Sequence, residues 1–197
     1  MADGPSVFEI FIGSILDNNI ALAFILGMCP LIAVSTSVKN AKGMGLAVIF
    51  VVTLTGIINY PIYVLLQRVE ATYIALLVFI ITIAATVQFM EMVIEKYFPA
   101  LYNAFGIFLP LITVNCAVLG VSLFFVNRSY NFIETASFSL GSGIGWMFAI
   151  LLLAGVREKL GRFGNVPKGL QGRAMAFIIL GILSLAVIGF AGLASVQ

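Results

Sequence analysis

The sequence has no histidine, only two cysteines and few charged residues, which make up 9% of its 197 positions. Without histidine, a serine–histidine–aspartate triad cannot form, and zinc, which usually takes four ligands, lacks a complete set. The ten basic residues form no long run of the kind that binds nucleic acid. These absences exclude histidine-dependent hydrolysis, a zinc site within the chain and a nucleic-acid partner.

Apolar residues are abundant instead, at 62% of the chain. A soluble domain of this length cannot bury so much apolar surface, so we expect a single integral membrane domain over residues 1–197, with the lipid bilayer as its solvent. The first apolar run has no basic segment before it and no small-residue cleavage site after it. We therefore expect no cleavable signal peptide.

Six apolar stretches are long enough to cross a bilayer, which takes about 20 helical residues. An isolated strand would leave its backbone amides and carbonyls without partners in hydrocarbon, so each stretch is expected to be helical. The predicted fold is an all-α polytopic membrane protein with six transmembrane helices. The stretches lie at about residues 7–37, 44–66, 71–94, 101–126, 133–156 and 173–194.

The basic residues lie mostly on one side of this topology. Eight of the ten fall in the first, third and fifth loops, and only Arg68 and Arg128 fall on the other side. Cytoplasmic loops carry an excess of lysine and arginine, so both termini are expected on the periplasmic face of a bacterial inner membrane. The eight are Lys39, Lys42, Lys96, Arg157, Lys159, Arg162, Lys168 and Arg173.

One motif occurs twice and carries both cysteines. Cys29-Pro-Leu-Ile-Ala-Val-Ser35 and Cys116-Ala-Val-Leu-Gly-Val-Ser122 share the order Cys, small, aliphatic, aliphatic, small, Val, Ser. Each cysteine lies ten to thirteen residues from the polar residues that bound its apolar run, which is roughly 15 to 20 Å along a helix. Both thiols are therefore expected near the membrane midplane.

A second pair of matching segments extends the repeat. Residues 43–50, which open the second stretch, match residues 141–148, which open the fifth. Because each half has three spans, the second half enters the membrane upside down, so the halves are predicted to be inverted repeats. The halves are about residues 1–98 and 99–197.

Gly141 and Gly145 form a small-xxx-small face for close helix packing.

The first and fourth helices, which carry the cysteines, are predicted to be interrupted. Pro30 follows Cys29 directly, and a proline inside a helix lacks the amide that the ladder needs and crowds the preceding turn. In the fourth stretch, Pro110 and Asn115 precede Cys116. Paired interruptions at matching places in two halves indicate a site near the midplane.

The two thiols allow several interpretations. They could be small buried hydrophobic residues, since free cysteine is among the most buried residue types. They could also form a disulfide. A soft thiolate pair at interrupted helices favours an iron–sulfur cluster, which needs four cysteine ligands. Cys29 and Cys116 supply two, so a second chain with a similar pair would supply the rest at the interface between the two chains. Backbone amides that are freed where the helices are interrupted, including those of Gly27 and Asn115, could hydrogen-bond the cysteine sulfurs.

Polar residues within the apolar stretches are the other candidates. An ionised carboxylate is costly inside a membrane, so Asp17 and Glu91 are candidates for ion binding, and Gln88 shares a helical face with Glu91. The simpler interpretation is that the side chains of Asp17 and Glu91 lie at the membrane surface. A secondary transporter also uses inverted repeats with broken helices, and an assembly scaffold without chemistry is a third alternative.

Residues 96–120 read KYFPALYNAFGIFLPLITVNCAVLG, and this segment is highly specific. On it the chain resembles the NqrDE/RnfAE family of membrane electron-transfer subunits, and the resemblance extends over essentially the whole length. Residues 97–99, 145–148 and 166–168 look more like the branch of sodium-translocating NADH:quinone reductases than that of Rnf ferredoxin:NAD complexes. Further support comes from Leu26-Gly-Met-Cys29, Gln88-Phe-Met-Glu91, Tyr130-Asn-Phe132 and Val166-Pro-Lys-Gly-Leu170.

The resemblance implies a subunit of a translocase with no complete active site of its own. It implies that Cys29 and Cys116 hold half of a 2Fe-2S cluster, which two cysteines of a paralogous membrane subunit complete. It also implies that this cluster carries electrons between a cytoplasmic subunit with flavin and iron–sulfur groups and an outward-facing flavin subunit, on the way to quinone. The transported ion, the donor and the acceptor come only from the resemblance.

Overall fold

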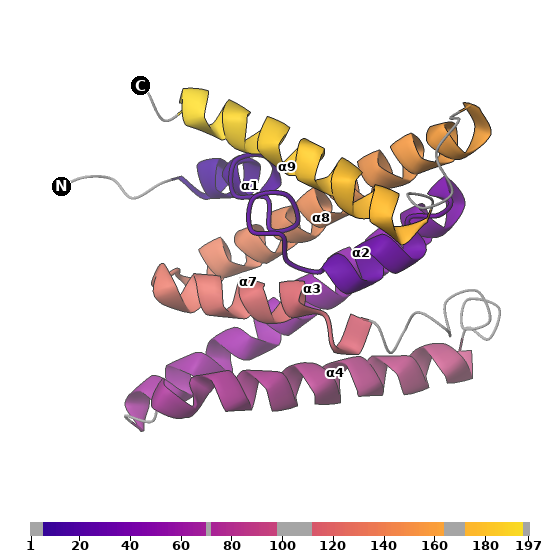
Figure 1. The fold of residues 1–197 in the computed structure, drawn as a ribbon. Helices are drawn as coiled ribbons and strands as arrows, with labels where there is room; N and C mark the ends of the chain where they lie inside the picture. Colours follow the sequence, from indigo (N-terminus) through magenta and orange to yellow (C-terminus); the bar gives the residue numbers. More distant parts are fainter. Residues whose placement is uncertain (1–5, 70–71, 98–111, 164–171, 195–197) are drawn as a thin grey trace.

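The computed structural model describes residues 6–69, 72–97, 112–163 and 172–194, and within them every regular element is helical (Figure 1). This confirms the predicted helical class for the described part of the chain. The elements are α1 (Val7–Ile15), α2 (Met28–Val34), α3 (Val38–Arg68), the 3-10 helix η1 (Thr72–Ile74), α4 (Ala75–Tyr97), α7 (Cys116–Asn127), α8 (Phe132–Phe163) and α9 (Arg173–Ala194).

Three of the described helices, α3, α4 and α8, are long and apolar enough to cross a membrane. Shorter apolar helical stretches lie at Cys116–Asn127 and Arg173–Gly189. Large apolar side chains are exposed on the outer faces of several helices, which suits contact with lipid. They include Leu46, Phe50, Leu77, Ile81, Ile182 and Leu185. Residues 101–111 of the predicted fourth span lie outside the described residues.

The first predicted span is interrupted, as Pro30 and its neighbours indicate. Helix α1 begins at a capping box, in which Ser6 and Glu9 each bond the other's backbone amide, and it ends at Ile15. Residues 16–27 then form turns before α2 begins at Met28. Before α7, the chain leaves helical geometry at Asn115, where φ is −78° and ψ is 113°.

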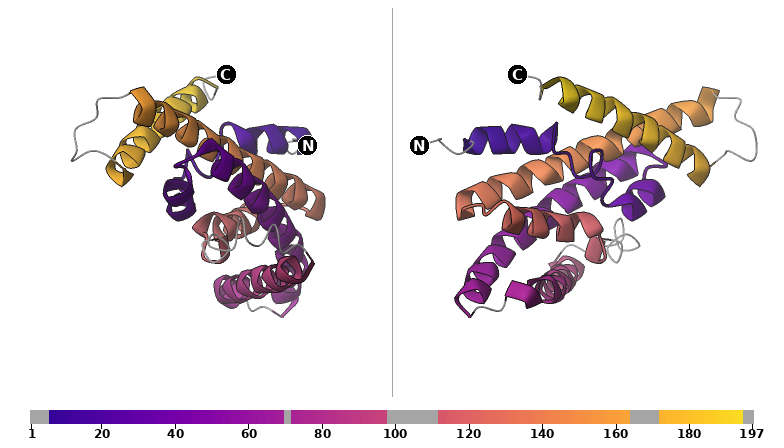
Figure 2. Two further views of the ribbon diagram at one scale, coloured as in Figure 1. Left: turned by 90° about the vertical axis from the view of Figure 1, so that its right-hand side faces the viewer. Right: turned by 60° about the vertical axis from the view of Figure 1, so that its left-hand side comes forward.

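Helices α3 and α8 pack against each other at the centre of the molecule (Figures 1 and 2). A side chain at Gly45 would collide with Met147, and one at Gly143 would collide with Ile49. Each glycine therefore packs on a residue that lies four positions after the other glycine. The same contact is made in both directions, as in a twofold interface.

The surrounding helices pack in matching pairs. Helix α4 packs on α3 and α9 packs on α8, and α4 and α9 lie on opposite sides of the central pair (Figure 1). Helix α2 packs against α9, and α7 packs against α3 and α4. The short cysteine-bearing helices therefore each contact a helix from the other half of the chain.

Candidate functional site

Both cysteines lie in the first turn of a short helix. Cys29 is the second residue of α2 and Cys116 is the first residue of α7. Both are free thiols and both are exposed on this chain. Neither cysteine is enclosed in the core of this chain.

A backbone–sulfur hydrogen bond joins the two cysteine segments. The amide of Gly27 donates to Sγ of Cys116 at 2.9 Å, across 89 positions of sequence. The predicted amide–sulfur bond at Gly27 is confirmed. Gly27 has φ of +77°, and an added Cβ would lie 2.5 Å from Nε1 of Trp146 and 2.9 Å from Oδ1 of Asn115. Only glycine fits this left-handed, crowded position.

Asn115 holds the start of the second cysteine helix. Its side chain is 4% exposed, and Oδ1 accepts a hydrogen bond of 3.0 Å from the amide of Ala117, as an N-cap does. This bond orients the side-chain amide, so that Nδ2 points away from the amide of Ala117. Within the described ranges, Nδ2 finds no hydrogen-bond partner. The structure thus places Asn115, a candidate from the sequence, directly against the Gly27 turn.

Trp146 is the residue of this site that sequence reasoning missed. It lies on α8, is 1% exposed and directs Nε1 toward Gly27. Its indole N–H likewise has no acceptor among the residues that the structure describes. The available signal was that the only tryptophan of the chain falls in residues 141–148, the segment that matches residues 43–50.

Asn19 organises the turn between α1 and α2. Its side chain is 1% exposed, and Nδ2 donates to the carbonyls of Ile15 and Gly145, both at 2.9 Å. Oδ1 accepts from the amides of Ala21 and Leu22.

The close approach of α1 to α8 confirms the packing face predicted at Gly141 and Gly145, because added side chains there would collide with residues 11–19.

Three hydrogen bonds hold the far ends of the cysteine motifs. Arg157 on α8 donates to the hydroxyl of Ser35 at 2.6 Å and to the carbonyl of Ile32 at 2.9 Å. Asn59 on α3 donates to the hydroxyl of Ser122 at 2.8 Å. Ser35 and Ser122 are the last residues of the two motifs. Asn59 lies 14 positions after Gly45, and Arg157 lies 14 positions after Gly143.

The other candidate residues lie apart from the cysteines. Asp17 and Gln88 are exposed and Glu91 is half-buried on α4. The described hydrogen bonds connect none of the three to a cysteine segment. Asp17 lines a cavity of about 470 Å³ together with Asn19 and apolar side chains of α1, α8 and α9. These positions suit the interpretation of Asp17 as a polar residue at the membrane surface.

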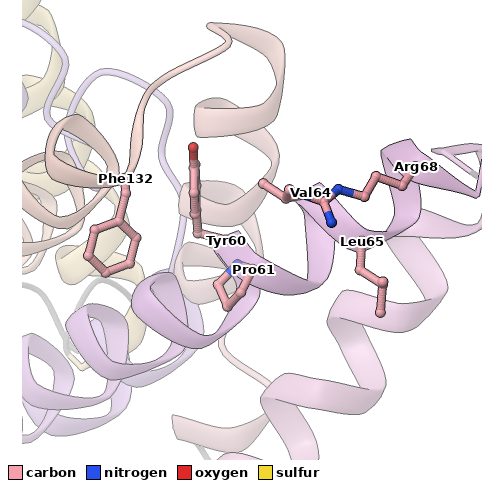
Figure 3. Close-up of a pocket in the computed structure, with 6 residues that line it drawn as sticks. All are labelled: Tyr60, Pro61, Val64, Leu65, Arg68 and Phe132. Carbon is pink, nitrogen blue, oxygen red and sulfur yellow. The ribbon is translucent and has the colours of Figure 1, made fainter.

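A second cavity, of about 340 Å³, lies between α3 and the start of α8. Figure 3 shows Tyr60 and Phe132 at one end and Arg68 toward the other. The ring centroids of Tyr60 and Phe132 are 5.5 Å apart. The lining is otherwise apolar and includes neither cysteine. It consists of Tyr60, Pro61, Val64, Leu65, Arg68 and Phe132.

The residues around the thiols fit half of an iron–sulfur site. In the described part of the chain, no group of three or more His, Cys, Asp or Glu residues could hold a metal ion, so a complete set of protein ligands is lacking there. Two exposed thiols at helix amino ends, with buried N–H donors behind them, suit a cluster ligated from two chains. The orphaned N–H groups of Trp146 and Asn115 are the observations that carry this fit.

Comparison with known proteins places these residues in context. A family model described as "Rnf-Nqr subunit, membrane protein" matches residues 7–194. The E-type subunit of the Na(+)-translocating NADH-quinone reductase of Maridesulfovibrio salexigens is 48% identical over 196 residues, which cover 94% of this chain and 96% of that protein. The E-type subunits of the same reductase from Methylococcus capsulatus and Aeromonas salmonicida are 49% and 47% identical, with the same coverage.

Proposed function

The chain belongs to the Rnf-Nqr family of membrane subunits, and from this premise we propose that it is the E-type subunit of a Na⁺-translocating NADH–quinone reductase. Relatives with that name are 47–49% identical over nearly the whole chain, which supports this assignment over its Rnf counterpart. In this role the chain relays electrons within a larger complex in the bacterial inner membrane.

The relay is a 2Fe-2S cluster, of which Cys29 and Cys116 are two ligands. The observation that carries this proposal is the hydrogen bond from the Gly27 amide to Sγ of Cys116, because it brings the two cysteine segments together. The cluster, when bound, supplies one-electron transfer. The protein's part is to present two thiolates at helix amino ends and to surround the sulfurs with N–H donors.

A paralogous membrane subunit supplies the other two cysteines. A 2Fe-2S cluster takes four ligands, and both thiols of this chain are exposed rather than enclosed. Exposure at helix ends leaves room for a second chain to approach. Flavin-bearing subunits of the same complex then exchange electrons with the cluster from the two sides of the membrane.

The chain folds as two inverted three-helix repeats with six membrane spans and periplasmic termini. Three structural relationships support this proposal: the reciprocal glycine contacts of α3 and α8, the matched packing of α2 and α7, and the paired bonds to Ser35 and Ser122. Reporter fusions at each loop test the topology. A reporter fused after residue 40 is expected in the cytoplasm and one fused at residue 130 in the periplasm.

Iron and acid-labile sulfide test the cluster. The chain co-expressed with its paralogous partner is expected to carry one 2Fe-2S cluster per pair, whereas the chain alone carries none in stoichiometric amount. Cys29→Ser and Cys116→Ser are each expected to remove the iron. Thr36→Ala changes an exposed polar residue near the same motif and should retain it. Unchanged iron in both cysteine variants would end the proposal.

The transporter alternative makes the opposite prediction. Under it, sodium uptake by vesicles that contain only this chain would survive replacement of both cysteines by serine and would fail in Asp17→Asn or in Glu91→Gln. The electron-transfer proposal expects no uptake by the chain alone. It also expects quinone reduction by the whole complex to persist in Glu91→Gln and to stop in either cysteine variant.

A further inference from the structure

The indole N–H of Trp146 is buried beside the cysteine segments without an acceptor. Trp146 is 1% exposed, so water does not reach its side chain to replace a protein partner. Nε1 is one of the few buried side-chain donors or acceptors within the described residues that lack a hydrogen bond. Burying an unsatisfied donor is costly, so such a group requires an explanation.

The position of this N–H indicates what it faces. Nε1 would lie 2.5 Å from a Cβ built on Gly27, whose own amide donates to Sγ of Cys116. Oδ1 of Asn115 is 2.9 Å from the same built atom, and Nδ2 of Asn115 is the second unpartnered donor at this place. Three N–H donors therefore gather around one glycine turn, and one of them already bonds a cysteine sulfur.

We propose that the Trp146 indole N–H donates a hydrogen bond to a sulfur of the iron–sulfur cluster held by Cys29 and Cys116, and raises its reduction potential. This inference rests on the proposed function of the two thiols. Trp146 is a positioning residue that acts on the cluster through its sulfurs, with the Nδ2 group of Asn115 as a companion donor.

The physical reason is the charge that reduction adds. One electron enters the cluster, no bond in the protein forms or breaks, and the sulfurs become more negative. A hydrogen bond to a sulfur is stronger in this reduced state, so an N–H donor favours reduction. Nε1 of Trp146 and Nδ2 of Asn115 have no acceptor among the described residues of this chain. A sulfur of the bound cluster would supply that acceptor.

Trp146→Phe is the decisive variant, because it keeps a buried aromatic ring and removes the N–H. In the purified complex, the equilibrium constant for one-electron reduction is expected to fall about tenfold, which is about 59 mV in midpoint potential. The potential is measured by redox titration followed by electron paramagnetic resonance. Phe138→Leu is the control, since Phe138 is an equally buried ring on α8 without a polar atom.

A second measurement separates the hydrogen bond from packing. In complex labelled with indole-¹⁵N tryptophan, the reduced cluster is expected to show a ¹⁵N hyperfine coupling that disappears in Trp146→Phe. If the variant binds less iron, its midpoint is taken from the loaded fraction, because the midpoint does not depend on occupancy.

An unchanged midpoint together with an unchanged ¹⁵N spectrum overturns the proposal for Trp146 and leaves the cluster ligands intact. A midpoint shift as large in Phe138→Leu as in Trp146→Phe also overturns it, since packing alone would then account for the effect. If the wild-type complex of both membrane subunits gives no iron–sulfur signal, the proposed function fails and this inference fails with it.

Discussion

The guanidinium of Arg157 on α8 donates a hydrogen bond of 2.6 Å to the hydroxyl of Ser35, at the carboxyl end of the helix that carries Cys29. The same guanidinium nitrogen reaches the carbonyl of Ile32. A cation at this end also meets the negative pole of the helix dipole. The corresponding bond in the other half comes from the neutral side chain of Asn59, so the two cysteine helices are held by groups of different charge.

Replacing Arg157 is expected to loosen α2. Arg157→Gln should lower the free energy of unfolding by about 1–3 kcal/mol, because it removes charge-assisted bonds to Ser35 and Ile32 from a partly buried place. Unfolding of the purified chain in increasing dodecyl sulfate measures the change. Lys159→Gln, at an exposed position on the same helix, is the control and should leave the transition in place.

Gly27→Ala is expected to damage both stability and the cysteine site. The residue would adopt φ of +77° with its Cβ against Trp146, Asn115 and Ala117, at a cost of about 1–3 kcal/mol. Iron content of the complex and unfolding of the chain should both decline. Gly181→Ala is the matched control, since nothing lies within 4 Å there. In the middle of α9, alanine should stabilise by roughly 0.5–1 kcal/mol.

The two glycines of the α3–α8 contact are expected to respond unequally to alanine. A Cβ at Gly143 would lie 2.8 Å from the backbone Cα of Ile49, whereas one at Gly45 meets side-chain atoms of Met147, the nearest being Cγ at 2.5 Å. Gly143→Ala should therefore destabilise by about 1–3 kcal/mol, as overpacking does, and Gly45→Ala by less. Equal effects in the dodecyl sulfate assay would contradict the backbone contact.

Asn19→Ala is expected to be among the most destabilising changes outside the cysteine site. It removes four hydrogen bonds and leaves the amides of Ala21 and Leu22 without the side-chain acceptor. A loss of about 2–4 kcal/mol is expected for such a buried network. Asn18→Ala, at the neighbouring less buried residue, tests specificity, and a larger effect there would contradict the role of Asn19.

Local features of the sequence determined several properties of this protein. Composition placed it in a membrane, because apolar surface in such excess has no other solvent. Apolar runs predicted helices, and the matching segments around Cys29 and Cys116 identified the candidate site. Pro30 and its neighbours predicted a break, and Gly141 and Gly145 predicted a close helix contact. Each of these depends on residue type and short spacing, which are visible without a fold.

Only the tertiary structure decided which residues meet. The bond between Gly27 and Cys116 crosses 89 positions and the one between Ser35 and Arg157 crosses 122, so no local spacing could reveal them. Trp146 escaped notice because an aromatic residue in an apolar helix gives the same sequence signal whether it faces lipid, core or a site. Its orphaned N–H exists only as a consequence of packing, since burial and the lack of an acceptor are properties of the folded chain.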